Sequence, residues 1–188
     1  DQPSLVYALR GLVGCEITVT GASGDQHSGT HGGGIANPIH ALSHLIASMK
    51  NLDGRITIEG FYDDVIELSD EERELFSKLP FDEKDYIEKL GVPDTFGEIG
   101  YTIQERLWAR PTLELNGIWG GYQGTGSKTV LPSKAHAKIT CRLVANQKPE
   151  RVYKLIKAHL ENNRPPGVTV EVKKLAGDAD PFLVPRGH

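Results

Sequence analysis

Four segments of this 188-residue chain alternate apolar and polar residues, and this period of two most constrains what the chain can fold into. The alternation covers residues 12–20, 112–118, 135–144 and 167–172, and β-branched residues occur in all four. Successive side chains of a strand point to opposite faces of its sheet. Each segment is therefore predicted to be a strand with one buried face.

Two further segments carry apolar residues at the spacing of an amphipathic helix. In the first, Asn37 is predicted to be the N-cap, Pro38 to occupy the first helical position, and the helix to end near residues 51–54. The second helix is predicted to begin at Pro149. Their apolar faces are formed by Leu42, Leu45, Ile46 and Met49 in the first and by Val152, Leu155, Ile156 and Leu160 in the second.

The order of these elements is strand, helix, strand, strand, helix, strand. This order is the split βαβ, or ferredoxin-like, pattern, in which a four-stranded antiparallel sheet carries two helices on one face. The fold class is therefore predicted to be α+β. Residues 1–188 are expected to form a single domain, because one core can accommodate all six elements.

A helical insertion is predicted at about residues 60–110, between the first helix and the second strand. Ser69 and Glu72 have the spacing of a capping box, and Asp82 can cap a second short helix that ends at Gly91. Acidic residues crowd this segment, and acidic side chains usually lie in water. They are therefore expected to form a solvated face.

Composition excludes several classes of function. Hydrophobic residues make up 38% of the chain and charged residues 24%, which is typical of globular domains. The net charge of −4 offers no basic surface for nucleic acid, and no apolar run approaches the roughly 18–20 residues that span a membrane. Cys15 and Cys141 lie in strand segments and are predicted to be buried thiols, which favours a cytoplasmic location.

Seven histidines raise the question of a metal site. His27 and His31 are four residues apart, but the glycines around them argue against a helix that would hold both toward one ion. His40 and His44 have helical spacing but lack the intervening glutamate of the zinc-protease motif. No metal site is therefore predicted on this chain.

Two other kinds of site are disfavoured by their motifs. Residues 120–129 are rich in glycine, but Ser127 stands where a phosphate-binding loop has lysine, and Pro132 prevents the helix that should follow. Backbone N–H groups of this turn could still hold an anion. His27 and Ser28 are adjacent, which rarely makes a base and its nucleophile, and the serine-hydrolase elbow is missing.

The glycine-rich loop at residues 25–38 combines His-Ser-Gly, Gly-Gly and Asn-Pro motifs. This loop resembles the signature of the aminoacylase, carnosinase and glutamate carboxypeptidase family of dizinc metallopeptidases. Further motifs appear in the order and approximate spacing of the carnosinase-like dipeptidase branch and cover nearly the whole chain: Leu9-Arg10-Gly11, Asp53-Gly54-Arg55-Ile56, Gly60-Phe61-Tyr62-Asp63, Arg110-Pro111-Thr112, Gly117-Ile118-Trp119-Gly120-Gly121, Lys128-Thr129-Val130-Leu131-Pro132 and Arg142-Leu143-Val144.

The resemblance implies a protein of two parts. Members of the family have a catalytic domain that holds two zinc ions and a ferredoxin-like lid domain, inserted within it, that commonly pairs two subunits. This chain resembles the lid and dimerisation domain alone, so the metal ligands and the glutamate base are expected before residue 1 and after residue 188. The parent is then expected to be a homodimeric zinc dipeptidase or amidohydrolase, and the isolated fragment to be inactive.

The resemblance also implies roles for three side chains. His27 corresponds to the lid histidine that reaches an active site, often that of the partner subunit, and donates a hydrogen bond to the developing oxyanion. Arg142 corresponds to the arginine that binds the C-terminal carboxylate of the substrate, for which a planar guanidinium is suited. Thr129 corresponds to a polar position that hydrogen-bonds substrate. Zinc-activated water would then hydrolyse a dipeptide-like substrate.

A rival interpretation is a free-standing ferredoxin-like module that binds a small molecule or another protein through its sheet face. Taken alone, His27 could be an ordinary loop histidine, and Arg142 an exposed strand arginine in a weak surface ion pair. An open reading frame limited to these residues would favour the rival. Coding sequence for metal ligands on both flanks would exclude it.

Overall fold

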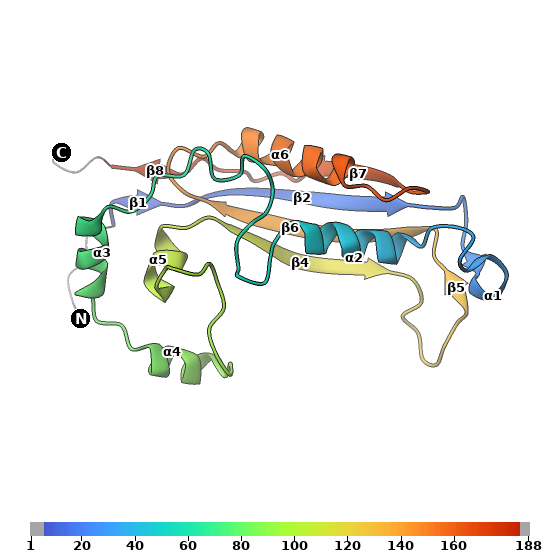
Figure 1. Cartoon of the computed structure of the whole chain (residues 1–188), viewed down its shortest axis with the longest axis horizontal. Coiled ribbons are helices and arrows are strands. Elements are labelled where there is room, and N and C mark those ends of the chain that lie inside the picture. The colour runs from blue at the N-terminus through green and yellow to red at the C-terminus, as the bar shows by residue number, and fades with distance from the viewer. Residues whose placement is uncertain (1–5, 185–188) are drawn as a thin grey trace.

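A four-stranded antiparallel sheet forms the centre of the protein, as seen in a computed structural model that describes residues 6–184 (Figure 1). Its strands are β2 (Gly11–Thr20), β4 (Thr112–Gly120), β6 (Lys134–Leu143) and β7 (Thr169–Lys174), in the spatial order β4-β6-β2-β7. The two central strands are thus the first and third of the four along the chain. This order confirms the predicted α+β, ferredoxin-like fold.

The two long helices cover the same face of the sheet. Among residues 6–184, no helix has both the length and the apolar character that a membrane-spanning helix needs.

On the covered face of the sheet, α2 (Pro38–Ser48) packs on β2 and β6, and α6 (Pro149–Asn162) packs on β2 and β7. Each fully buried aliphatic side chain contributes about 1.5–3 kcal/mol of stability. The core between sheet and helices includes Val13, Cys15, Ile17, Val19, Leu42, Leu45, Met49, Ala137, Ile139, Leu143, Val152, Ile156 and Leu160.

Local sequence sets the ends of α2. Asn37 accepts a backbone N–H at 2.9 Å and Pro38 stands at the first helical position, as predicted. The helix ends at Ser48, a few residues earlier than predicted. The reason is an antiparallel bridge between Lys50 and Ile56, which turns the chain back toward the sheet.

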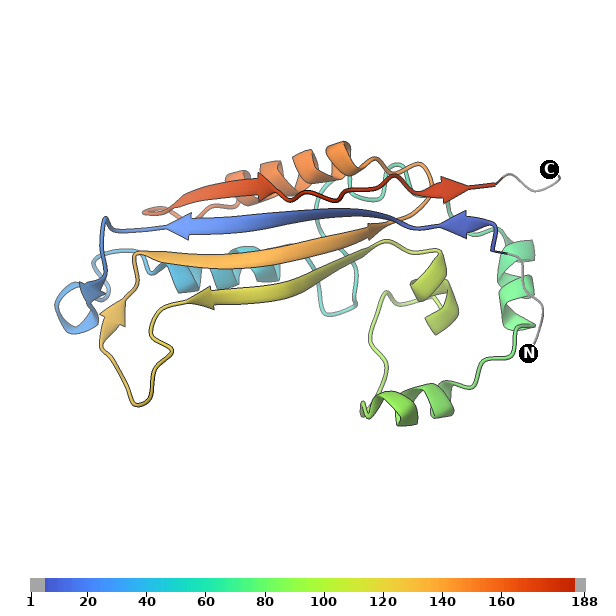
Figure 2. The ribbon, with the colours of Figure 1, turned by 180° about the vertical axis from the view of Figure 1, so that it is seen from behind.

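The other face of the sheet is not covered by any helix of the described residues, as Figure 2 shows. We call it the open face. Burial alternates along β2 and β6, because every second side chain points to the helices and the next one points to the open face. Side chains on the open face include Glu16, Thr18, His136, Lys138 and Arg142.

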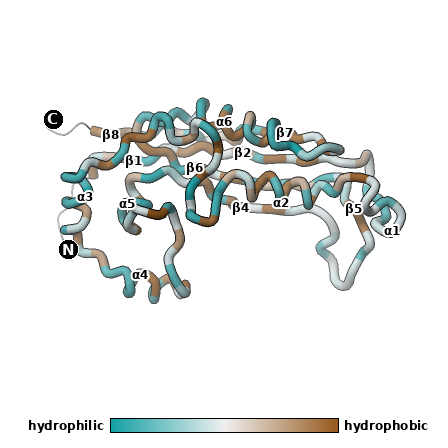
Figure 3. Tube along the Cα trace, viewed as in Figure 1, coloured by the Kyte–Doolittle hydropathy of each residue, from teal (hydrophilic) through white to brown (hydrophobic). Residues whose placement is uncertain are grey.

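The insertion predicted at about 60–110 contains three short helices, α3 (Asp70–Ser77), α4 (Glu83–Leu90) and α5 (Ile103–Trp108). α3 and α4 begin at the two predicted caps, whereas α5 was not predicted and begins at a second capping box on Thr102. Hydrophilic and hydrophobic residues are interleaved along these helices (Figure 3). They extend the domain at the end of the sheet near β1 and β8 (Figure 1).

A cluster of charges around buried Arg110 holds segments of the insertion together. The Arg110 side chain is 3% exposed and donates to Glu98 from Nε at 2.9 Å and Nη2 at 3.0 Å, and to Glu67 from Nη1 at 2.9 Å. Burial alone would lower the pKa of Arg110, but the hydrogen bonds to Glu98 and Glu67 outweigh it and raise this pKa. The prediction that the acids of the insertion form a solvated face is wrong for Glu98 and Glu105, which are both buried.

Two short strands lie beyond the main sheet. β1 (Ala8–Leu9) pairs with β8 (Phe182–Leu183), so segments from the two ends of the described chain lie side by side (Figure 1). The segment before β8 runs close to the start of β2. A Cβ atom on Gly11 would lie 2.5 Å from the carbonyl oxygen of Ala179. Only glycine fits there, which gives the glycine of the Leu-Arg-Gly motif a steric reason.

Replacing Glu98 by alanine should destabilise the domain by about 3 kcal/mol, because Arg110 would lose its bidentate partner in a buried site. Urea unfolding followed by circular dichroism measures the loss. Glu74→Ala is the matched control, since the ion pair of Glu74 with Lys78 is exposed and contributes about 0–1 kcal/mol. Equal stability of the two variants would contradict a structural role for the buried pair.

Candidate functional site

A histidine and a threonine meet on the loops at one end of the sheet. His27 ends β3 (Gln26–His27), which pairs with β5 (Val130–Leu131), and Thr129 directly precedes β5. The Nε2 atom of His27 lies 2.9 Å from the Oγ1 atom of Thr129. Both side chains are exposed. Two of the three predicted site residues are thus together, and we call them the loop pair.

Hydrogen bonds assign the proton of the His27 ring. Its Nδ1 atom accepts the backbone N–H of Gly29 at 3.0 Å and so caps the short helix α1 (Ser28–His31). A ring nitrogen that accepts carries no proton, so the single proton of the neutral ring is on Nε2. Nε2 therefore donates to the Thr129 hydroxyl. The loop presents an exposed N–H donor whose tautomer is fixed by its own backbone.

The loops that carry the pair are tied to each other. A carboxylate oxygen of Asp25 accepts the N–H of Ser133 at 2.8 Å, and the N–H of Ser28 donates to the carbonyl of Thr129 at 3.0 Å. The N–H of Gly21 also donates to the carbonyl of Ser133 at 2.9 Å. These bonds fix the separation of the two loops, and therefore the position of the donor.

Arg142 lies at the opposite end of the sheet. On β6 it pairs with Leu12 of β2 and with Thr112 of β4, and its exposed side chain points to the open face. From Leu12, β2 runs eight residues to Thr20, where the chain leaves for the loop pair, a distance of roughly 26 Å at the usual rise of a strand. Within one subunit, the structure does not bring Arg142 to the loop pair.

The histidines between residues 6 and 184 do not gather around a metal position. In the described part of the chain, no three side chains of histidine, cysteine, aspartate or glutamate are grouped closely enough to hold a metal ion. His31 lies in the last turn of α1, whereas His27 caps its start. His40 and His44 are exposed on α2.

The open face carries an aromatic cluster that sequence analysis did not single out. Trp119 of β4 stacks on His136 of β6, with ring centroids 5.0 Å apart and planes at 12°. The Oγ1 atom of Thr18 lies 3.1 Å from the Nδ1 atom of His136, and Lys138 lies over the Trp119 ring. Alternation in the sequence places His136 on the open face, but its partners come from other strands. Only the register of the sheet assembles them.

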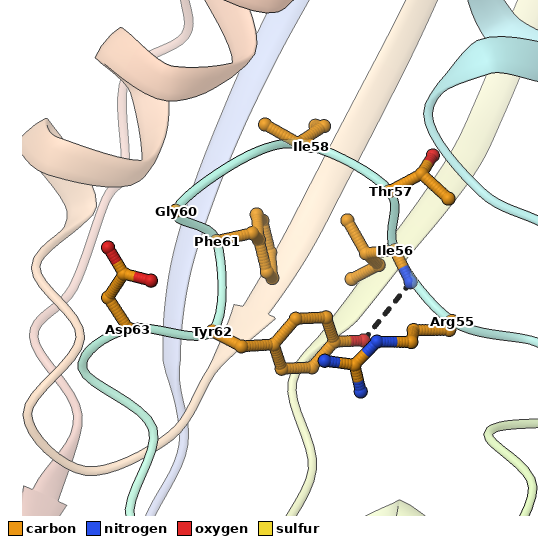
Figure 4. A pocket seen from close by; sticks show the side chains of 8 residues that line it. All are labelled: Arg55, Ile56, Thr57, Ile58, Gly60, Phe61, Tyr62 and Asp63. Atoms are coloured by element: carbon orange, nitrogen blue, oxygen red, sulfur yellow. Dashed lines mark hydrogen bonds between the residues drawn. The ribbon is translucent and has the colours of Figure 1, made fainter.

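A pocket of about 320 Å³ lies elsewhere, in the turn that follows α2 (Figure 4). All its lining residues lie between 55 and 63, so none of the predicted site residues contributes. The Tyr62 hydroxyl accepts the N–H of Ile56 at 3.1 Å, and burial raises the pKa of Tyr62. The charged lining residues, Arg55 and Asp63, are both in ion pairs. With these groups engaged, we assign no ligand to the pocket.

The chain has relatives among known proteins. The family model of the peptidase dimerisation domain matches residues 7–168. The chain is 36% identical over 160 residues to a Cys-Gly metallodipeptidase of Schizosaccharomyces pombe, covering 85% of this chain and 33% of that protein. It is 31% identical over 161 residues to the Beta-Ala-His dipeptidase of Homo sapiens, covering 86% and 32%. The chain thus spans about one third of the length of these relatives.

Solved structures agree with this relationship. Human carnosine dipeptidase 1 is similar with a TM-score of 0.85 and 28% identity, over 97% of this chain and 39% of that one. A metallo-carboxypeptidase of Sulfolobus solfataricus is similar with a TM-score of 0.81 and 37% identity, over 96% and 46%. The predicted resemblance to carnosinase-like peptidases is confirmed. From its sheet topology and from the match of the family model over most of its length, the chain belongs to the peptidase dimerisation domain family.

Proposed function

We propose that this chain is the dimerisation and substrate-binding lid of a zinc-dependent dipeptidase or related amidohydrolase. The observation that carries the proposal is the exposed His27 side chain, whose Nε2 is held as a hydrogen-bond donor. The pairing of β1 with β8 supports it, because a chain that enters and leaves at one end suits a domain inserted into another. The similarity of the chain to a Cys-Gly metallodipeptidase also supports it.

Zinc chemistry belongs outside the described residues in this proposal. They offer no cluster of metal ligands, so two zinc ions would be held by a separate catalytic domain, where they would supply activated water. The isolated lid is then inactive.

The two cysteines of the chain are free and buried, and burial raises the pKa of Cys15 to about 12, so neither is primed for redox chemistry. Unpaired thiols favour a cytoplasmic location.

His27 would act at the carbonyl oxygen of the scissile bond. When water attacks the carbonyl carbon, negative charge develops on that oxygen, and a donor already in place stabilises it without reorganisation. Gly29 holds Nδ1 as an acceptor, so the Nε2 proton is directed outward to the Thr129 hydroxyl. In the complex, the Nε2–H group of His27 would donate its hydrogen bond to the substrate oxygen in place of the Thr129 hydroxyl. The freed Thr129 hydroxyl could then hydrogen-bond a neighbouring substrate atom.

Arg142 would bind the C-terminal carboxylate through a planar pair of N–H donors. A dipeptide in an extended conformation spans only about 7 Å, whereas roughly 26 Å of strand separates Arg142 from the loop pair. One substrate cannot touch both in a single subunit. We therefore place Arg142 of one subunit and the loop pair of its partner in one shared site.

The exposed edge of β4 is the surface that would join two copies. Leu115 and Ile118 point to the helix-covered face but remain 41% and 52% exposed, and an edge strand has unpaired N–H and C=O groups. A two-fold axis makes two β4 strands antiparallel, with Thr112 of one near Gly120 of the other. The Arg142 end of each sheet then lies beside the loop pair of the partner, as the shared site requires.

In the full-length enzyme, His27→Ala should lower kcat by ~10²–10³ with little change in KM, because the lost hydrogen bond strengthens only as the oxyanion forms. Steady-state kinetics on a dipeptide and circular dichroism separate this loss from unfolding. His31→Ala is the matched control from the same loop and should keep full activity. A fully active His27→Ala enzyme would exclude the oxyanion role and favour a simple binding module.

Subunits that carry His27→Ala should complement subunits that carry Arg142→Ala. Each variant homodimer lacks one group at both sites, whereas a mixed dimer has one site with both groups and one with neither. Heterodimers isolated through two different affinity tags should therefore recover about half of wild-type activity. If both groups acted within one subunit, the heterodimer would be no more active than the variant homodimers.

Ile118→Lys should weaken the dimer, because the substitution brings a charge into the apolar part of the β4 edge. Light scattering over a concentration series measures the shift toward monomer. Leu90→Lys is the control, since Leu90 is similarly exposed, at 57%, but lies on α4 in the insertion. An unchanged dimer for Ile118→Lys would place the contact elsewhere.

A further inference from the structure

A second arginine lies beside Arg142 on the sheet. Arg10 directly precedes β2, and the first pair of that ladder joins Gly11 to Leu143. Arg10 therefore shares the face of Leu12 and is a diagonal neighbour of Arg142, at the spacing of about 7–8 Å that long side chains bridge easily. Half-burial, and then repulsion from Arg142, lower the pKa of Arg10, as two nearby guanidinium groups should.

Neither guanidinium has a carboxylate partner among the described residues. Asp178 and Asp180 flank Ala179, the bridge partner of Leu12, and like Glu16 of the open face they are already paired with lysines. These pairs are Asp178 with Lys174 at 2.9 Å, Asp180 with Lys148 at 3.5 Å, and Glu16 with Lys138 at 3.4 Å. Arg10 is half-buried, and a half-buried arginine is normally paired with an acid. Arg10 and the exposed Arg142 lie side by side without such a partner, so both have N–H groups free to bind an anion.

The chemistry of the pair indicates which anion. A guanidinium presents its N–H groups in a planar fork that matches one carboxylate. One carboxylate would occupy the fork of Arg142, which leaves the fork of Arg10 about one side-chain length away. A ligand with two carboxylates on one residue would satisfy both forks and cancel the repulsion between the two cations.

We propose that Arg10 and Arg142 form a site for a dianionic C-terminal residue, so that the parent enzyme favours dipeptides that end in aspartate or glutamate. This inference rests on the proposed function, in which Arg142 binds the α-carboxylate. Arg10 binds the side-chain carboxylate and acts as a specificity residue. It takes no part in the bond-breaking step.

The test uses the full-length enzyme and two substrates, Ala-Asp and Ala-Ala. The wild-type enzyme should have the lower KM for Ala-Asp. Arg10→Gln should raise the KM for Ala-Asp by about 10-fold or more, since a hydrogen bond to a charged group is lost, and should change the KM for Ala-Ala by less than about 2-fold. kcat should stay the same for both. Arg10→Lys should recover part of the preference for Ala-Asp.

Lys138→Gln controls for the loss of one positive charge from the open face and should leave the preference unchanged. An equal effect of Arg10→Gln on both substrates would overturn the inference, because it would show that Arg10 supports the fold or contacts the catalytic domain. A wild-type enzyme without preference for Ala-Asp would also overturn it. Arg142→Gln should raise both KM values, and no change in either would instead refute the proposed carboxylate clamp.

Discussion

The pairing of β2 with β6 is the constraint on which the other features of this domain depend. The two strands pair over their whole length, from Gly11 with Leu143 to Thr20 with Lys134. A slip of one residue would turn Cys141 to the open face and bury Arg142 against the helices. The same register holds the loop pair at one end and the arginines at the other. Core formation and site geometry therefore follow from a single ladder of hydrogen bonds.

The main sheet and its helices could be predicted because their signals are local. A strand with one buried face shows a period of two in its own sequence, and α2 shows its Asn37 cap and Pro38 directly. α5 has a local signal in the capping box of Thr102 and Glu105, but its six residues are too few for a helical period to emerge beside it. The β1–β8 pair has two residues on each side and joins the two ends of the described chain, so no local pattern marks it. Glu98 is acidic like its neighbours, and only the fold places it against Arg110.

The candidate site was less accessible to sequence reasoning. Residue type alone would assign His27 and Arg142 ordinary surface roles. The resemblance to a family identified both as candidate site residues but did not show how far apart they lie in one subunit. The contact of His27 with Thr129 spans 102 residues and depends on the pairing of β3 with β5. The tautomer of His27 follows from one backbone hydrogen bond. Arg10 belongs to the Leu-Arg-Gly motif, but that motif does not show that Arg142 of another strand lies beside it.

In the proposed dimer, the length of the sheet determines where the two sites form. Each sheet contributes its arginine end to one site and its loop pair to the other, so the two sites lie apart by a distance that the strands set. A flexible connection would let the loop pair drift relative to the partner's arginine, and a misplacement of about 1 Å can cost ~10² in rate. A twisted, helix-backed sheet resists such drift, because its interior is close-packed. The packing that buries the core therefore also keeps the loop pair and Arg142 of each subunit at a fixed separation.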